Sequence, residues 1–176
     1  MIDFIILALP RSGSAWLANL FSSGDVLCLH DPLSEHSLKS LAARKKAHGG
    51  ILGVVDTSLG LMPGLVDGID CPKARLMRPV AEINESLAAC GLSHRVGYLE
   101  TLRLQQLECP RIEYEHLHDY TIMSAIFSHL TGREGLDKSR FDELCKLNVQ
   151  RHPASFAPDY SNLEKLITEY AKHHVT

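Results

Sequence analysis

Stretches of nearly continuous hydrophobic residues alternate along the chain with stretches in which hydrophobic residues recur every three or four positions. The continuous runs predict buried strands of a parallel sheet, and the periodic stretches predict amphipathic helices. The predicted strands are residues 2–9, 25–29, 51–56, 74–77 and 111–114. The predicted helices are residues 14–21, 34–48, 59–65, 80–90, 96–107, 119–130, 138–147 and 161–173. This order predicts an α/β fold, a three-layer sandwich with a central parallel sheet of about five strands.

Nothing in the sequence divides the chain into separate domains. Its 176 residues correspond to one domain of ordinary size. No repeat of fixed period, low-complexity tract or long linker interrupts it, and the only candidate hinge is the loop at residues 150–160. The sequence therefore predicts one domain over residues 1–176, with a helical C-terminal segment at about 137–176.

Composition and charge narrow the class of protein. Hydrophobic residues make up 45% of the chain and charged residues 22%, which is typical of a folded globular protein. No apolar run reaches the roughly 18 residues of a membrane span, and the net charge of -3 argues against general nucleic-acid binding. The five cysteines stand singly, and no basic region precedes the first apolar run. We therefore expect a cytoplasmic protein that lacks a disulfide framework and does not associate with membranes or nucleic acid.

The first predicted strand leads directly into the sequence PRSGSAWL at residues 10–17. A strand, a turn with glycine and the start of a helix form an anion-binding arrangement, because backbone N–H groups and the helix N-terminus converge there. Gly13 lets the backbone approach a ligand, and Arg11 adds a guanidinium suited to phosphate or sulfate. Ser12 and Ser14 carry hydroxyl donors. The alternative is an ordinary strand-to-helix turn with a serine cap and a surface arginine.

This loop differs from two widespread phosphate-binding loops. It is neither G-x-x-x-x-G-K-[ST] nor G-x-G-x-x-G. It resembles the 5'-phosphosulfate-binding loop of sulfotransferases, P-[KR]-[ST]-G-[ST]-[ST]-W-L, from which only Ala15 departs. The resemblance implies a P-loop NTPase/sulfotransferase-like fold, a small bacterial- or phage-type member, and the donor 3'-phosphoadenosine 5'-phosphosulfate (PAPS). The residues that it assigns to the donor are Arg11, Ser12, Gly13, Ser14, Ala15 and Trp16.

A second pair of residues follows the fourth predicted strand. Arg78 comes directly after this strand, and Ser86 lies eight residues later in a predicted helix. Because the carboxyl ends of parallel strands meet at one edge of the sheet, we expect Arg78 to face the same edge as Arg11. The pair resembles the arginine and serine that hold the 3'-phosphate of PAPS in sulfotransferases, although the family's R-[DN]-P-x5-S pattern is altered between them. The alternative is an exposed arginine and a serine on a helix surface.

A candidate base follows the second predicted strand. Residues 28–33 read CLHDPL and resemble the acidic-Pro segment of many sulfotransferases, whose carboxylate often serves as the catalytic base. An acceptor hydroxyl or amine must lose a proton as it attacks sulfur, so this chemistry needs such a group. The resemblance gives Asp31 this role, and His30 is the second candidate because imidazole titrates near neutral pH. The alternative is a simple turn, which Asp-Pro commonly starts.

Weaker signals complete the sequence picture. Residues 112–117, IEYEHL, resemble a mainly structural segment near the last strand of sulfotransferases. Residues 56–58, DTS, end the third strand and could face a ligand or cap a helix. Arg151 occupies the place of a cofactor-closing loop in the chain order, and Trp16 is interpreted as a core residue with a contact to adenine as the alternative. The ten histidines are scattered without an H-E-x-x-H motif, so we expect no metal site.

Together these patterns predict a sulfotransferase-like enzyme that transfers a sulfuryl group from PAPS to a hydroxyl or amine, leaving adenosine 3',5'-bisphosphate. The acceptor would be a small molecule or a group on a surface, and Arg11 would neutralise charge on the bridging oxygen. Two alternatives stay open: a non-catalytic nucleotide- or anion-binding module of the same fold, and a small P-loop-superfamily kinase, against which the missing loop lysine counts. The chain is shorter than most sulfotransferases, so we also expect a partner or a second copy, in a homo-oligomer, to complete the site.

Overall fold

A computed structural model describes residues 2–34 and 36–147 of the chain. Within this part, five parallel strands form one sheet in the order β2-β3-β1-β4-β5. The strands are β1 (Phe4–Ala8), β2 (Val26–His30), β3 (Ile51–Asp56), β4 (Lys73–Met77) and β5 (Arg111–Glu113). All five residues of β1 are buried because other layers cover both faces of the sheet, which explains the continuous hydrophobic run in the sequence.

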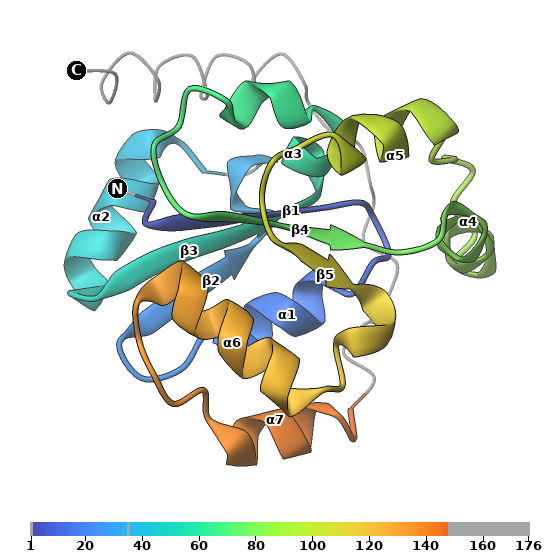
Figure 1. Ribbon diagram of the computed structural model, residues 1–176. Helices are drawn as coiled ribbons and strands as arrows, with labels where there is room; N and C mark the ends of the chain where they lie inside the picture. The colour runs from blue at the N-terminus through green and yellow to red at the C-terminus, as the bar shows by residue number, and fades with distance from the viewer. Residues whose placement is uncertain (1, 35, 148–176) are drawn as a thin grey trace.

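Helices cover both faces of this sheet, so the predicted α/β architecture with three layers is confirmed (Figure 1). The α-helices of the described residues are α1 (Ser14–Phe21), α2 (Leu38–His48), α3 (Thr57–Leu61), α4 (Val80–Ala89), α5 (Tyr98–Gln105), α6 (Tyr120–Thr131) and α7 (Lys138–Leu144). Three short 3-10 turns join them: η1 (Pro32–Ser34), η2 (Pro63–Val66) and η3 (Tyr114–His116). Figure 1 shows α1, α6 and α7 on one side of the sheet and α3 and α5 on the other.

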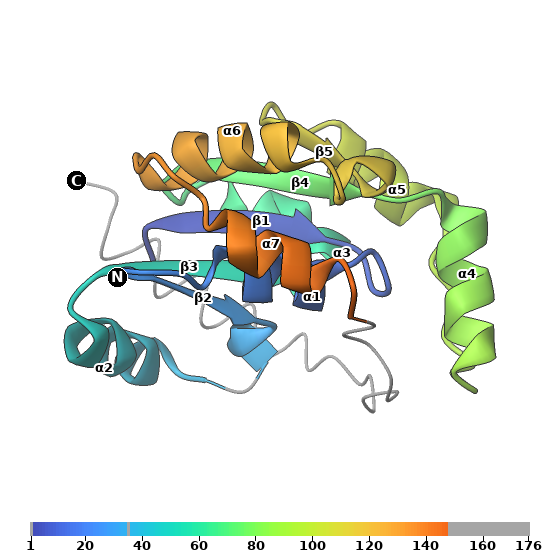
Figure 2. The same cartoon turned by 90° about the horizontal axis from the view of Figure 1, so that it is seen from below.

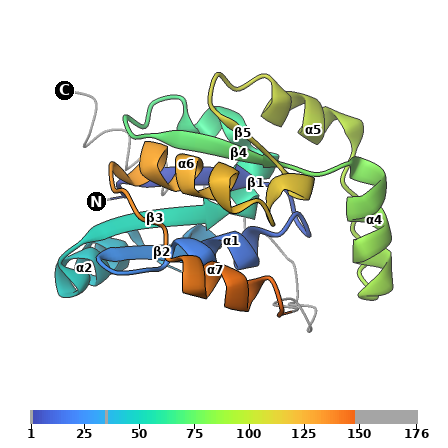
Figure 3. The same cartoon turned by 60° about the horizontal axis from the view of Figure 1, so that its bottom comes forward.

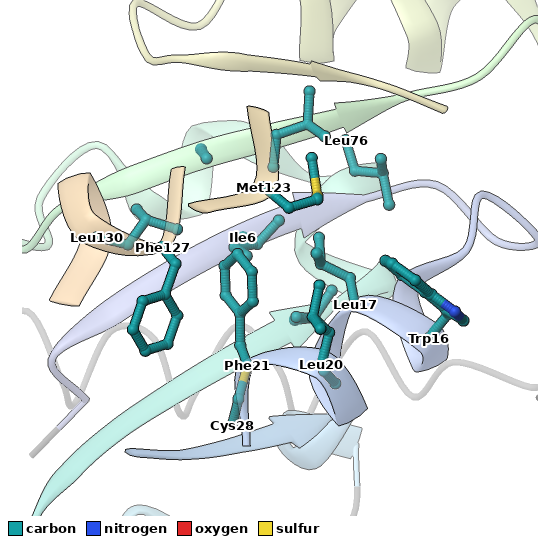
Figure 4. Packing of buried hydrophobic residues seen from close by; sticks show 14 of the residues in the cluster. Ile6, Trp16, Leu17, Leu20, Phe21, Cys28, Leu76, Met123, Phe127 and Leu130 are labelled. Atoms are coloured by element: carbon teal, nitrogen blue, oxygen red, sulfur yellow. The ribbon is translucent and has the colours of Figure 1, made fainter. Parts of the chain in front are cut away.

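Each face of the sheet has its own hydrophobic core. Alternate residues of β1 point to opposite faces: Phe4 and Ile6 join the core beneath α1, α6 and α7, whereas Ile5 and Leu7 join the other core. In the first core the ring of Phe21 packs edge-on against Phe4 and Phe127, with centroid distances of 6.4 and 5.3 Å. Figure 4 shows Phe21 and Phe127 together with Met123 and Leu76 between the helices and the strands.

The carboxyl end of β1 is a point where the chain connections diverge. The connection that leaves β1 runs through α1 on one face, whereas those that leave its neighbours β3 and β4 run through helices on the other face. In open α/β sheets a ligand crevice forms at such a switch point. Figures 2 and 3 show that α4 stands beyond the carboxyl ends of the strands, and its residues Ile83 and Leu87 join the second core.

Most of the predicted helices differ by one to three residues at an end, and two predicted helices differ more. The helix expected over residues 34–48 starts only at Leu38, because residues 32–34 form the separate turn η1 and the Ser37 hydroxyl caps the helix by accepting from the Ser40 N–H at 3.1 Å. The helix expected over residues 59–65 is split into α3 and η2. Pro63 lacks an N–H group, so the helix cannot continue through it unchanged.

Three predictions concern residues outside the described part: the hinge at 150–160, the last helix at 161–173 and the role of Arg151. Within the described part, no helix has the length and hydropathy that a membrane span requires.

Candidate functional site

The loop between β1 and α1 has an unusual backbone. Arg11 and Gly13 have φ angles of 61° and 91°, in the left-handed region that residues other than glycine rarely adopt. The buried Ser12 hydroxyl donates a hydrogen bond to the Leu9 carbonyl and so holds the turn together. Gly13 is the N-cap of α1 and gives no side-chain cap, and the first turn carries no acidic residue. The N–H groups at the start of α1 are therefore suited to an external anion.

The two arginines and the serine predicted from the sequence do meet at this edge. The Arg11 Nε donates to the Ser86 Oγ at 2.9 Å, which ties the loop to α4. The Arg78 Nη1 donates to the Arg11 carbonyl oxygen at 2.6 Å. The Arg78 guanidinium also pairs with Glu82 at 3.1 Å and lies over the Tyr114 ring at 4.0 Å from its centroid. Arg78 therefore supports the loop backbone in addition to contributing a positive charge.

A hydroxyl, an imidazole and a carboxylate cluster on the β2 side of the loop. The Ser14 Oγ lies 3.0 Å from the His30 Nε2, and the same nitrogen lies 3.3 Å from the Asp31 Oδ2. Asp31 has a φ of 46°, and its Oδ1 accepts a hydrogen bond from the Thr57 N–H at 2.7 Å. Because both contacts use one imidazole nitrogen, His30 does not relay a proton between Ser14 and Asp31 as in a catalytic triad. The other nitrogen, Nδ1, takes part in neither contact.

Asp56, at the end of β3, lies behind this cluster and is 0% exposed. Its Oδ1 caps α3 by accepting from the Leu59 N–H at 3.0 Å, and its Oδ2 accepts from the Leu33 N–H at 3.3 Å. The capping interpretation of this segment is therefore confirmed. Burial raises the pKa of Asp56 from 3.8 to about 7, the negative charge of Asp31 adds to the rise, and backbone N–H groups oppose it.

This raised pKa of Asp56 predicts how stability changes with pH. As the pH rises above about 4, the unfolded chain releases this proton whereas the folded chain keeps it, so the free energy of unfolding falls until about pH 7. The total loss from this group is at most about 4 kcal/mol. In urea titrations at pH 5, 6 and 7, Asp56→Asn should flatten the decline, and the exposed control Asp70→Asn should not. Equal slopes in wild type and Asp56→Asn would show that Asp56 is ionised in the folded protein.

Trp16 does not line the exposed edge of the loop. Its side chain is 6% exposed, and its Nε1 donates to the Leu144 carbonyl at 3.1 Å. Its ring packs against Phe141 and His118, with centroid distances of 6.0 and 5.5 Å. The interpretation of Trp16 as a core residue is confirmed. A base could stack on this indole only by displacing one of these two rings.

Two residues that pack against the loop, Tyr114 and Leu117, were not predicted as site residues from the sequence. The side chains of Tyr114 and Leu117, after β5, lie against Gly13, and a Cβ placed on Gly13 would be 2.6 Å from the Leu117 Cδ1. Tyr114 also lies under the Arg78 guanidinium. The sequence indicated these two residues only through the resemblance of residues 112–117 to a structural segment of sulfotransferases. In the structure this segment packs against the loop and so limits its conformation.

No protein-family model and no curated protein matches the chain. Among the described residues, no group of three or more His, Cys, Asp or Glu side chains is arranged to hold a metal ion.

Proposed function

We propose that the edge after β1 binds the phosphate groups of a nucleotide and that the protein is a sulfotransferase-like enzyme that uses PAPS. The observation that carries this proposal is the Arg11–Ser86 hydrogen bond. It joins the loop that resembles a 5'-phosphosulfate site to the serine that resembles a 3'-phosphate ligand, although the two are separated by 75 positions in the chain. Both lie at the switch point of the sheet, where ligands bind in folds of this class.

In this proposal the backbone of residues 11–16 surrounds the 5'-phosphosulfate. The N–H groups at the start of α1 and the hydroxyl of Ser14 donate to its oxygens. Ser86 and the guanidinium of Arg78 hold the 3'-phosphate, for which Arg78 would exchange its contact with Glu82. Ala15 supplies only its backbone N–H, because it lacks the hydroxyl that the resembling loops carry.

The proposed reaction moves a sulfuryl group between two oxygens, or from oxygen to nitrogen. The acceptor forms a bond to sulfur as the bond to the 5'-phosphate oxygen breaks, and adenosine 3',5'-bisphosphate leaves. Arg11 offsets the charge that develops on the leaving oxygen. The acceptor's proton goes to His30, because both oxygens of Asp31 already have hydrogen-bonding or ionic partners whereas the imidazole is 37% exposed and its Nδ1 faces neither partner. Asp31 then orients the imidazole, and its negative charge stabilises the imidazolium.

A second candidate is a nucleotide-binding module without catalysis. The contacts of Arg78 with Glu82, Tyr114 and the Arg11 carbonyl favour this candidate. They stabilise the nucleotide-binding loop, and none of them contributes a group that would bind an acceptor. A screen of hydroxyl and amine acceptors with a donor carrying radiolabelled sulfate separates the two. Labelled product that disappears in His30→Gln supports the enzyme, whereas binding without product from any acceptor supports the module.

Calorimetric titration with adenosine 3',5'-bisphosphate tests the nucleotide site itself. Arg11→Ala and Arg78→Ala should each weaken binding by about 1–3 kcal/mol, or about five- to 150-fold, because each removes a charged hydrogen-bond donor. Arg44→Ala, on the exposed side of α2, removes the same charge far from the loop and serves as the matched control. No heat at millimolar ligand contradicts the proposal, and equal affinity for ATP points to a kinase or a general anion site.

A further inference from the structure

The hydrogen bond between Ser14 and His30 joins two parts of the site that the proposed function treats separately. Ser14 is the first residue of α1, is 1% exposed, and lies in the loop that would hold the anion. His30 ends β2 and would handle the acceptor's proton. Because the Ser14 Oγ lies 3.0 Å from the His30 Nε2, a change in the charge or hydrogen bonding of one group affects the other.

The position of Asp31 determines which atom of this contact donates. Its Oδ2 lies 3.3 Å from the His30 Nε2, and a bare nitrogen lone pair facing a carboxylate oxygen would be repelled. A proton on Nε2 is therefore favoured, and the Ser14 oxygen accepts from it. The single hydrogen of the Ser14 hydroxyl is then left to donate to an oxygen of an anion held in the loop.

We infer that binding of an anion in the loop is coupled, through Ser14, to the uptake of a proton by His30. An anion that accepts from the Ser14 hydroxyl places negative charge near the His30 Nε2, which Asp31 already faces. Two nearby negative groups favour the imidazolium over the neutral ring. By reciprocity, a protonated His30 binds the anion more tightly. This inference rests on the proposed anion site. An imidazolium formed on anion binding must release its Nδ1 proton to solvent before His30 can accept the proton of an acceptor group.

Among the described residues, two carboxyl groups bear directly on the charge of His30. On its own segment Asp31 is the direct partner, and from β3 the buried carboxyl of Asp56 acts on Asp31. Neither α1 nor η1 contains a charged or titratable side chain. Asp56 also gains a proton as the pH falls, and this too would strengthen anion binding, so a test must separate Asp56 from His30.

Sulfate is the right probe, because it keeps two charges between pH 6 and pH 8. For the full chain followed by NMR, we expect sulfate to bind about tenfold more tightly at pH 6 than at pH 8, as one proton linked to one anion allows. His30→Gln should lose most of the difference, Asp56→Asn should keep most of it, and Ser14→Ala should lose most of it. Calorimetry of the wild type in two buffers of different ionisation enthalpy needs no variant and should show proton uptake on binding at pH 7.

The outcomes separate this inference from the proposed function. If sulfate and the bisphosphate bind at neither pH, the anion site itself is wrong and the coupling falls with it. If sulfate binds without proton uptake, or if His30→Gln keeps the full pH dependence, the anion site stands and the coupling through Ser14 is overturned.

Discussion

Replacing Gly60 with alanine is expected to destabilise the protein by about 3 kcal/mol or more, a large share of the stability of an ordinary domain. A Cβ at this position would lie 1.8 Å from the Ala8 carbonyl oxygen and 2.4 Å from its carbon. Both atoms belong to the backbone of β1, the central strand, which β3 and β4 hold on either side. Since β1 cannot shift without breaking the sheet and α3 follows β3 with no intervening residue, the clash has no inexpensive relief.

The measurement is the urea midpoint of Gly60→Ala against that of Gly64→Ala. Gly64 lies four residues later in η2, where the nearest heavy atom to an added Cβ is 4.0 Å away. Gly64→Ala should therefore stay within about 0.5 kcal/mol of the wild type. Equal midpoints for the two variants would mean that α3 does not pack on the end of β1 as described. The result bears on the site, because α3 starts at Thr57, whose N–H holds Asp31.

Gly13→Ala is expected to weaken binding of adenosine 3',5'-bisphosphate by at least about tenfold while lowering stability by only about 1–2 kcal/mol. Gly13 has a φ of 91°, and an added Cβ would lie 2.6 Å from the Leu117 Cδ1 and 3.4 Å from the Tyr114 ring. The end of the leucine side chain can move, so the fold survives. The loop must nevertheless shift or twist, and its N–H groups then no longer converge on one anion.

Gly132→Ala is the matched control for this change. Gly132 ends α6 with a φ of 65°, and nothing lies within 4 Å of an added Cβ. It should therefore show the same cost of a left-handed alanine without any contact with the loop, and binding should be unchanged. If Gly13→Ala binds the bisphosphate as well as Gly132→Ala does, the loop backbone is not the anion site.

Much of the fold follows from the hydrophobic pattern alone. The run ending at Leu9 marks a strand buried on both faces, because only continuous apolar residues satisfy two cores at once. The ends of helices were less well predicted, since they depend on single capping contacts. The hydroxyl of Ser37 caps the N-terminus of α2, and the carboxyl of Asp56 caps that of α3. Near each N-terminus the sequence contains several side chains that can act as a cap, so it does not identify which one does.

For the site, the sequence by itself determined which residues gather at one edge. Arg11 and Arg78 each follow a strand and His30 ends one, and parallel strands end on the same side of a sheet. Only the tertiary structure decided their partners: Arg11 with Ser86, Ser14 with His30, and Gly13 with Leu117. The order of the strands and the positions of the helices bring these residues together, although they belong to segments that are distant in the chain. No local pattern encodes such contacts, because each depends on how two separate layers pack on one sheet.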